Sequence, residues 1–145
     1  MKIYLDNCCL NRPFDDQSNQ RIHLESETIK AIFKQCREGY WQLVLSDVSH
    51  FEIAKTTDTV RRQKLRVLAA LAEYTVKLTP DIQQRASIFE ATGIKTFDAL
   101  HLACAEGHAD VFLTVDDRLM KKAQQLQDLG IPVAVPLRWI DEVIQ

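Results

Sequence analysis

The sequence contains little glycine or proline, four residues of each in 145, so low complexity and disorder are excluded. It lacks any run of about 20 apolar residues, which a membrane-spanning helix would need. The apolar stretch at the amino terminus is short and Asp6 interrupts it, which argues against a signal peptide. We therefore expect a cytoplasmic protein without a membrane anchor, folded as one domain over residues 1–145.

Other features with a known chemistry are also missing. The four cysteines show no C-x-x-C and no zinc-like spacing, so we expect free thiols that are mostly buried. The net charge is only −2, so a surface that attracts nucleic acid must be local. G-x-S-x-G, G-x-G-x-x-G and a P-loop are absent, which argues against acyl transfer and against dinucleotide or P-loop nucleotide binding.

The chain does contain a regular alternation of apolar runs and amphipathic segments. Strands are predicted at residues 2–6, 41–46, 76–79, 111–115 and 132–136. Helices are predicted at 20–37, from Ser46 onward, and at 57–74, 80–92, 96–106, 116–130 and 138–144, with a loop at 11–19. This order predicts an α/β fold in three layers, α/β/α, with a parallel sheet of four to five strands covered on both faces.

Four acids fall near the carboxyl ends of these predicted strands. Asp6 ends the first strand, and Asp116 follows the strand at 111–115. Glu52 lies one to two turns into the helix after the second strand, and Asp98 lies in the first turn of the helix at 96–106. Because ligands of open parallel sheets bind beyond the carboxyl ends of the strands, the four carboxylates are expected to meet at one rim.

Carboxylates that lie so close together raise one another's pKa values and need a cation or a basic partner. With acid and water ligands and no His or Cys cluster, Mg²⁺ or Mn²⁺ is the expected ion. Such an ion activates water and stabilises an in-line displacement, so metal-dependent phosphodiester hydrolysis is favoured. Each acid alone has a plainer interpretation: Asp98, and one of Asp116 and Asp117, as helix caps, and Glu52 as a solvated side chain.

Four stretches resemble the acidic motifs of PIN-domain ribonucleases in order and spacing: YLDNCCL, SDVSHFEIAK, TFDALHLACAEGHAD and FLTVDDRLMKKA. The most specific parts are DALHLA and the T-x-D-x-x-L pattern of Thr114, Asp116 and Leu119, and the resemblance spans nearly the whole chain. It implies a parallel sheet between helices and the cleavage of RNA with Mg²⁺ or Mn²⁺. Many bacterial members are toxins of VapBC-type toxin–antitoxin pairs, so it also implies an antitoxin partner.

Carried over position by position, the resemblance assigns catalysis to Asp6, Glu52, Asp98 and Asp116. The three aspartates among them, Asp6, Asp98 and Asp116, are the implied metal ligands. Thr114 matches the Ser or Thr that supports the last acid, and Asp117 is a further acid near the metal. Asn7 stands where the family usually has Ser or Thr, and its amide is expected to order a metal-bound water.

Basic residues near these acids are candidate RNA contacts: Arg12 in the loop, and Arg61, Arg62 and Lys64 at the start of the helix predicted at 57–74. The alternatives are a solvated surface or the docking of an acidic partner. His101, one turn after Asp98, is expected to be a packing residue bonded to backbone rather than a general base.

Two other functions remain open from the sequence. The departure at Asn7 is compatible with a catalytically inert PIN-like module that binds RNA or protein. A phosphate-binding domain similar to a response-regulator receiver fits less well, because Asp81 is the only acid near the end of the strand predicted at 76–79. Exposed helix surface is also compatible with a homodimer.

Overall fold

The computed structural model describes residues 1–144, with a five-stranded sheet in which neighbouring strands are all parallel. The strand order is β3-β2-β1-β4-β5. The strand bounds are β1 Lys2–Leu5, β2 Gln42–Ser46, β3 Tyr74–Val76, β4 Val111–Leu113 and β5 Val133–Ala134. Because every strand runs the same way, the carboxyl ends share one edge, and β1 lies at the centre between β2 and β4. The predicted parallel sheet of four to five strands is confirmed.

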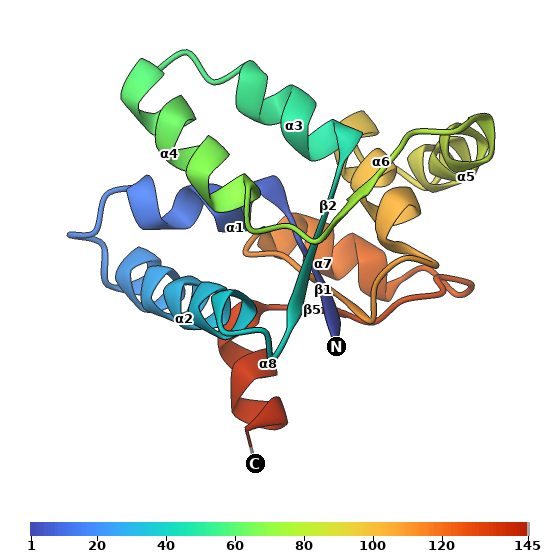
Figure 1. Ribbon diagram of the computed structural model, residues 1–145. Helices are drawn as coiled ribbons and strands as arrows, with labels where there is room; N and C mark the ends of the chain where they lie inside the picture. Colours follow the sequence, from blue (N-terminus) through green and yellow to red (C-terminus); the bar gives the residue numbers. More distant parts are fainter. Residues whose placement is uncertain (145) are drawn as a thin grey trace.

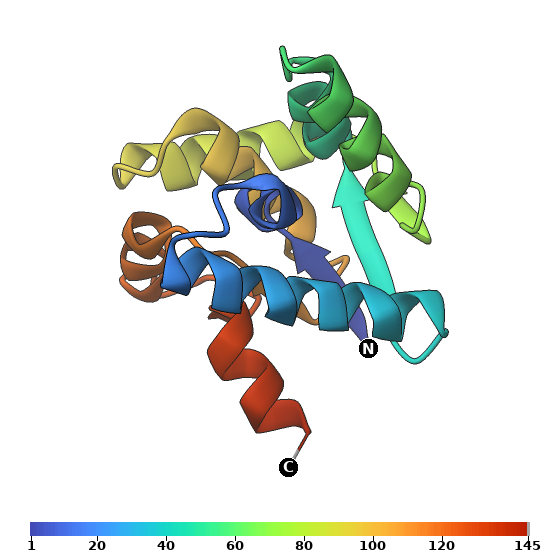
Figure 2. The same ribbon diagram turned by 90° about the vertical axis from the view of Figure 1, so that its left-hand side faces the viewer.

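Helices cover both faces of this sheet, as predicted (Figure 1). Their bounds are α1 Asn7–Asn11, the 3₁₀ helix η1 Arg12–Phe14, α2 Gln20–Arg37, α3 Asp47–Ala54, α4 Thr59–Ala69, α5 Pro80–Ala91, α6 Thr96–Ala105, α7 Asp117–Gln124 and α8 Pro136–Val143. Helices α1, α2, α4 and α8 supply the core on one face, and α5, α6 and α7 supply it on the other. Figure 2 shows α2 running across the strands and α8 extending away from them.

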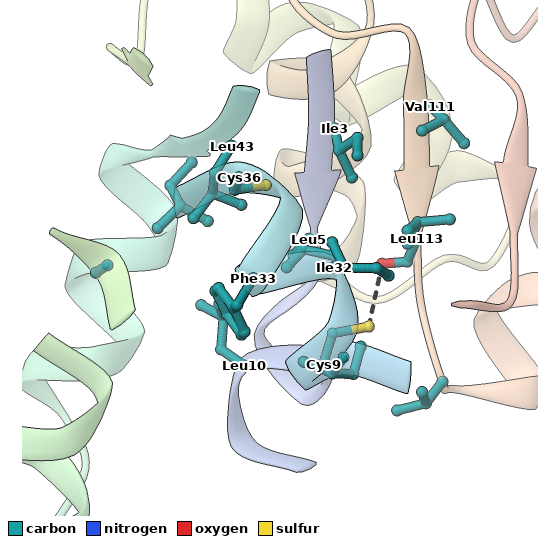
Figure 3. Close-up of a cluster of buried hydrophobic side chains, with 14 of the residues drawn as sticks. Ile3, Leu5, Cys9, Leu10, Ile32, Phe33, Cys36, Leu43, Val111 and Leu113 are labelled. Atoms are coloured by element: carbon teal, nitrogen blue, oxygen red, sulfur yellow. Dashed lines mark hydrogen bonds between the residues drawn. The ribbon is translucent and has the colours of Figure 1, made fainter. Parts of the chain in front are cut away.

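The central strand is buried on both faces, which fixes the position of the residue that follows it. Ile3 and Leu5 of β1 contact the apolar side of α2 (Figure 3), whereas Tyr4 faces the opposite core and stacks on Phe112. The Cys9 thiol donates a hydrogen bond to the carbonyl oxygen of Leu113 at 3.4 Å, so α1 is tied to β4. All four cysteines are free thiols, and only Cys8 is partly exposed.

The largest difference from the sequence prediction follows β1. Residues 7–11 form α1, which was not predicted, and η1 occupies part of the segment predicted as a loop at 11–19. Helix α1 starts at this point because the Asp6 carboxylate caps it, accepting a hydrogen bond from the Asn7 backbone N–H at 2.8 Å. The strand therefore passes directly into a helix at the carboxyl edge of the sheet.

Several element boundaries also differ from the prediction; β3 ends at Val76 rather than at residue 79, β4 ends at Leu113 rather than at residue 115, and β5 spans only Val133–Ala134. Helix α4 ends at Ala69 rather than at residue 74, and β3 starts two residues earlier than predicted. Helix α4 ends early and β3 starts early because β3 pairs with β2. Tyr74 lies opposite Val44, and this pairing overrides the helical pattern of the preceding residues. Helix α7 ends at Gln124 rather than at residue 130, before the turn into β5. Within residues 1–144, no helix combines the length and the hydropathy needed to cross a bilayer.

Candidate active site

The four acids singled out in the sequence line one pocket of about 360 Å³. Its wall consists of Asp6, Asn7, Cys8, Asn11, Asp15, Glu52, Arg61, Asp98 and Asp116. Asp6 and Asp116 come from the ends of the adjacent strands β1 and β4, while helices α3 and α6 bring in the other two acids. The expected convergence at the carboxyl edge of the sheet is therefore present in the structure.

Asp6 is the most firmly held of the four. Its side chain is almost fully buried, and its Oδ2 accepts hydrogen bonds from Thr114 Oγ1 at 2.8 Å and from the Cys8 thiol at 3.2 Å. Thr114 is itself completely buried and also accepts a hydrogen bond from the backbone N–H of Asp116 at 3.1 Å. The Thr114 hydroxyl thus contacts the last acid, as the sequence resemblance implied, and also links it to Asp6.

Asp116 and Asp117 have different surroundings, although they are neighbours in sequence. Asp116 lines the pocket and caps α7, because its Oδ1 accepts hydrogen bonds from the backbone N–H groups of Arg118 and Leu119 at 2.9 and 3.1 Å. Asp117 is 67% exposed and forms a two-point ion pair with Arg21 at 2.7 and 2.8 Å, which lowers its pKa. Asp117 is not among the residues that line the pocket, so the structure does not place it with the other acids.

Asp98 does not cap its helix, in contrast to the plainer interpretation of the sequence. The cap position of α6 is Lys95, and no side chain makes a capping hydrogen bond there. Burial, together with the negative charges of Asp6, Asp116 and Glu52, raises the pKa of Asp98 to about 6, against a partial opposing effect of His101. A carboxyl group whose charge is this unfavourable is a typical feature of a functional site.

Glu52 reaches the pocket from α3 and is held by a histidine. The His101 Nε2 forms a hydrogen bond with Glu52 Oε1, and the same contact is an ion pair when the imidazole is protonated. On its other side, His101 Nδ1 lies 2.6 Å from the hydroxyl of Tyr4. The sequence-based expectation that His101 bonds to backbone is therefore wrong. The sequence feature that indicated His101 as a candidate residue of this site was its position one helical turn after Asp98.

The predicted RNA-binding cations are all engaged within the protein. Arg61 lies in the pocket wall and pairs with Asp15 at 2.9 Å, while Arg12 pairs with Glu25 at 2.9 Å. Arg62 donates to the carbonyl oxygen of Thr56, and the Lys64 ammonium lies over the ring of Phe14. Arg61 is the only one of these four that lines the acidic pocket. Their contacts with RNA remain a prediction.

The donor set fits a hard divalent cation. Among residues 1–144, no group of three His, Cys, Asp or Glu side chains is arranged so that it could hold a metal ion. Mg²⁺, however, is usually bound through one or two carboxylates, with waters and substrate oxygens completing the shell. Asn7 lines the pocket, and its buried Oδ1 has no hydrogen-bond partner within the protein, so it has a free capacity to accept a hydrogen bond from an ordered water.

A larger cavity, of about 570 Å³, lies beside the edge strand β3 and the start of α5. Its wall includes Lys2, Lys77 and His108 and contains none of the four acids. The acidic pocket is therefore the smaller of the two cavities, and it is identified by its chemistry rather than by its size.

Three solved structures share this arrangement of strands and helices. VapBC2 from Rickettsia felis bound to a promoter DNA fragment matches with a TM-score of 0.59 and 12% identity, over 93% of this chain and 98% of that chain. FitAcB from Neisseria gonorrhoeae matches with 0.61 and 16%, over 92% and 97%. DNA-bound VapBC from Salmonella typhimurium matches with 0.62 and 13%, over 94% and 98%.

Comparison with protein-family models and with the sequences of curated proteins gave no match. The structural similarity, at these low identities, establishes the fold. The chain has a PIN-like, VapC-like α/β fold, as the sequence resemblance implied.

Proposed function

We propose that the protein is a metal-dependent endoribonuclease that hydrolyses phosphodiester bonds in RNA. The observation that carries this proposal is the convergence of four carboxylates on one pocket at the carboxyl edge of the sheet, where Asp98 has a pKa raised to about 6. Such a concentration of negative charge is stabilised by a divalent cation, and a phosphodiester is a substrate whose developing charge that cation can neutralise.

In this proposal Asp6, Asp98 and Asp116 hold Mg²⁺ or Mn²⁺. Such an ion, when bound, would supply Lewis-acid stabilisation of the phosphate oxygens and would lower the pKa of the attacking water. Thr114 keeps the Asp6 carboxylate in place through its 2.8 Å hydrogen bond, and the Asn7 amide oxygen accepts a hydrogen bond from a water in the pocket. Glu52, whose Oε1 is occupied by His101, accepts the proton of the attacking water at Oε2.

The proposed biological setting is a toxin–antitoxin pair. The support is that two of the solved structures that share the fold are VapBC complexes bound to DNA. We infer an antitoxin protein as the partner, and we expect induced expression of the wild-type chain alone to arrest growth of a bacterial host. Asp98→Asn should relieve this arrest at equal expression, and arrest by both proteins would contradict a toxin whose action depends on the pocket.

The direct test of the activity is cleavage of an end-labelled RNA pool by purified protein, with Mg²⁺ or Mn²⁺ and with EDTA. Asp98→Asn should lower the cleavage rate by about 10²-fold or more, the range found when a group that acts on the reacting atoms is removed. Asp117→Asn is the matched control, because Asp117 lies beside Asp116 at the start of α7 yet pairs with Arg21 outside the pocket wall. It should cleave at the wild-type rate.

Equal cleavage by both aspartate variants would contradict the assignment of Asp98. The absence of cleavage by the wild-type protein with either metal would favour the other function left open by the sequence, a PIN-like module that binds RNA or protein without cutting it.

A further inference from the structure

A line of hydrogen-bonded side chains runs from the acidic pocket into the core of the protein. It begins at Glu52 in the pocket wall and continues through His101, Tyr4 and Ser46, of which the last three are buried to 1% exposure or less. The four residues come from α3, α6, β1 and the end of β2. The line therefore ties the two helices that carry Glu52 and Asp98 to the two central strands.

The geometry leaves His101 with a fixed partner on each ring nitrogen. Nε2 bonds to Glu52, and Nδ1 lies 2.6 Å from the Tyr4 hydroxyl. That hydroxyl in turn lies 2.7 Å from Ser46 Oγ. If the ring is neutral, Nε2–H donates to Glu52 and Nδ1 accepts from Tyr4; if it is protonated, both nitrogens donate and the Tyr4 hydroxyl donates to Ser46. Glu52 accepts a hydrogen bond from Nε2 in both cases.

His101 and Glu52 depend on their shared hydrogen bond to different degrees. A buried imidazole is costly unless both nitrogens are bonded, so His101 requires a partner at Nε2. Glu52 is partly exposed and would be solvated without His101. As a long side chain it would then occupy several rotamers, at a cost in conformational entropy whenever one of them is required for reaction.

We propose that His101 is a positioning residue, which holds the Glu52 carboxylate in the orientation used for RNA hydrolysis and is itself held by Tyr4 and Ser46. This proposal rests on the proposed function, because holding Glu52 in one orientation affects the reaction only if Glu52 takes part in it. Orienting partners of this kind act through the residue they hold, and their removal lowers activity by about 10- to 100-fold. His101 need not contact RNA or metal.

A pair of substitutions separates positioning from simple packing. In His101→Gln, the side-chain amide nitrogen can replace Nε2 and donate to Glu52. In His101→Asn, the shorter amide can replace Nδ1 and reach Tyr4 only. Both place a polar amide at the same buried position, so a packing role predicts similar effects. Positioning predicts that the Asn variant cleaves RNA about 10- to 100-fold more slowly at saturating RNA, with the KM for RNA unchanged, and that the Gln variant retains most activity.

A double-mutant cycle with Glu52→Gln gives the decisive cleavage result. If His101 acts through Glu52, His101→Asn should add less than about a twofold loss in the Glu52→Gln background, because coupled residues are not additive. If the losses of activity caused by His101→Asn and Glu52→Gln multiply in the double variant, the proposal is overturned. His108→Gln is the control. His108 follows α6, is exposed, and bonds to the carbonyl oxygen of Cys104.

A second measurement needs neither RNA nor metal and keeps the two proposals distinguishable. Nitrogen-15 NMR of the imidazole rings should show a hydrogen-bonded, exchange-protected His101 Nε2–H that shifts in Glu52→Gln, while Tyr4→Phe should shift Nδ1. A His101 resonance that is unchanged in Glu52→Gln would overturn the positioning proposal. If the hydrogen bond between His101 and Glu52 is present but the protein cleaves no RNA, the proposed function is overturned. The hydrogen bond would then have no catalytic role.

Discussion

Asp98 is the residue at which stability and function conflict most clearly. Its pKa is raised to about 6 by burial and by the neighbouring acids, against about 3.9 for an aspartate in an unfolded chain. Folding therefore favours the protonated form. The stability that this form contributes is fully present below about pH 4 and is lost as the pH rises through about 6. At neutral pH and without a cation, the ionised Asp98 destabilises the fold.

Asp98→Asn is therefore predicted to stabilise the protein while it lowers the rate of RNA cleavage. In EDTA at pH 7.5, its free energy of unfolding should exceed that of the wild type by about 1–2 kcal/mol. A pKa difference of about 2 corresponds to about 2.7 kcal/mol, and this is reduced because Asp98 is partly exposed and water screens its charge. At pH 4 the two proteins should be nearly equal. Urea denaturation at both pH values measures this, and a stability difference that does not change with pH would contradict the raised pKa.

At the scale of elements, strands and helix caps place the acids. The end of β2 passes directly into α3, where Ser46 and Ser49 form reciprocal capping hydrogen bonds between side chain and backbone. This junction fixes the start of the helix that carries Glu52. Ser46 also bonds to the Tyr4 hydroxyl, so one residue both starts the helix and supports the partner of His101.

The cap of α5 offers a contrasting case, because it starts a helix that carries no acid of the pocket. Thr79 Oγ1 accepts a hydrogen bond from the backbone N–H of Ile82 at 3.2 Å. Thr79→Ala should lower the free energy of unfolding by about 1 kcal/mol, the usual cost of a lost cap, and leave RNA cleavage unchanged. Chemical denaturation and the cleavage assay check both parts. A large loss of cleavage would show that the cavity beside β3 contributes to the reaction.

At the scale of the whole molecule, the arrangement of the acids was predictable because it follows from topology. Asp6 and Asp116 follow strands, and the ends of parallel strands share an edge whatever the angles between the helices. The contacts of individual side chains were not predictable in this way. His101 and Tyr4 are 97 positions apart, and their contact depends on how α6 packs on the sheet.

The contacts of the basic residues near the pocket could not be predicted from the sequence either. The sequence indicated Arg61 and Arg12 as candidate RNA contacts, but the unpredicted turn from α1 into η1 brings Asp15 within 3.2 Å of both. Long-range pairing of this kind has no local pattern. The net charge near the pocket is consequently less positive than the basic run suggests, and contacts with RNA phosphates must compete with these internal ion pairs.

We propose that the acidic pocket uses a divalent cation to cleave RNA. The most direct measurement is the single-turnover rate of cleavage of one labelled RNA as a function of Mn²⁺ concentration, for the wild type, Asp98→Asn and Asp117→Asn. We predict a rate that is zero in EDTA and saturates with Mn²⁺ for the wild type and Asp117→Asn. For Asp98→Asn the rate should stay at least about 10²-fold lower at every concentration. A rate independent of Mn²⁺, or equal in all three proteins, would contradict the proposal.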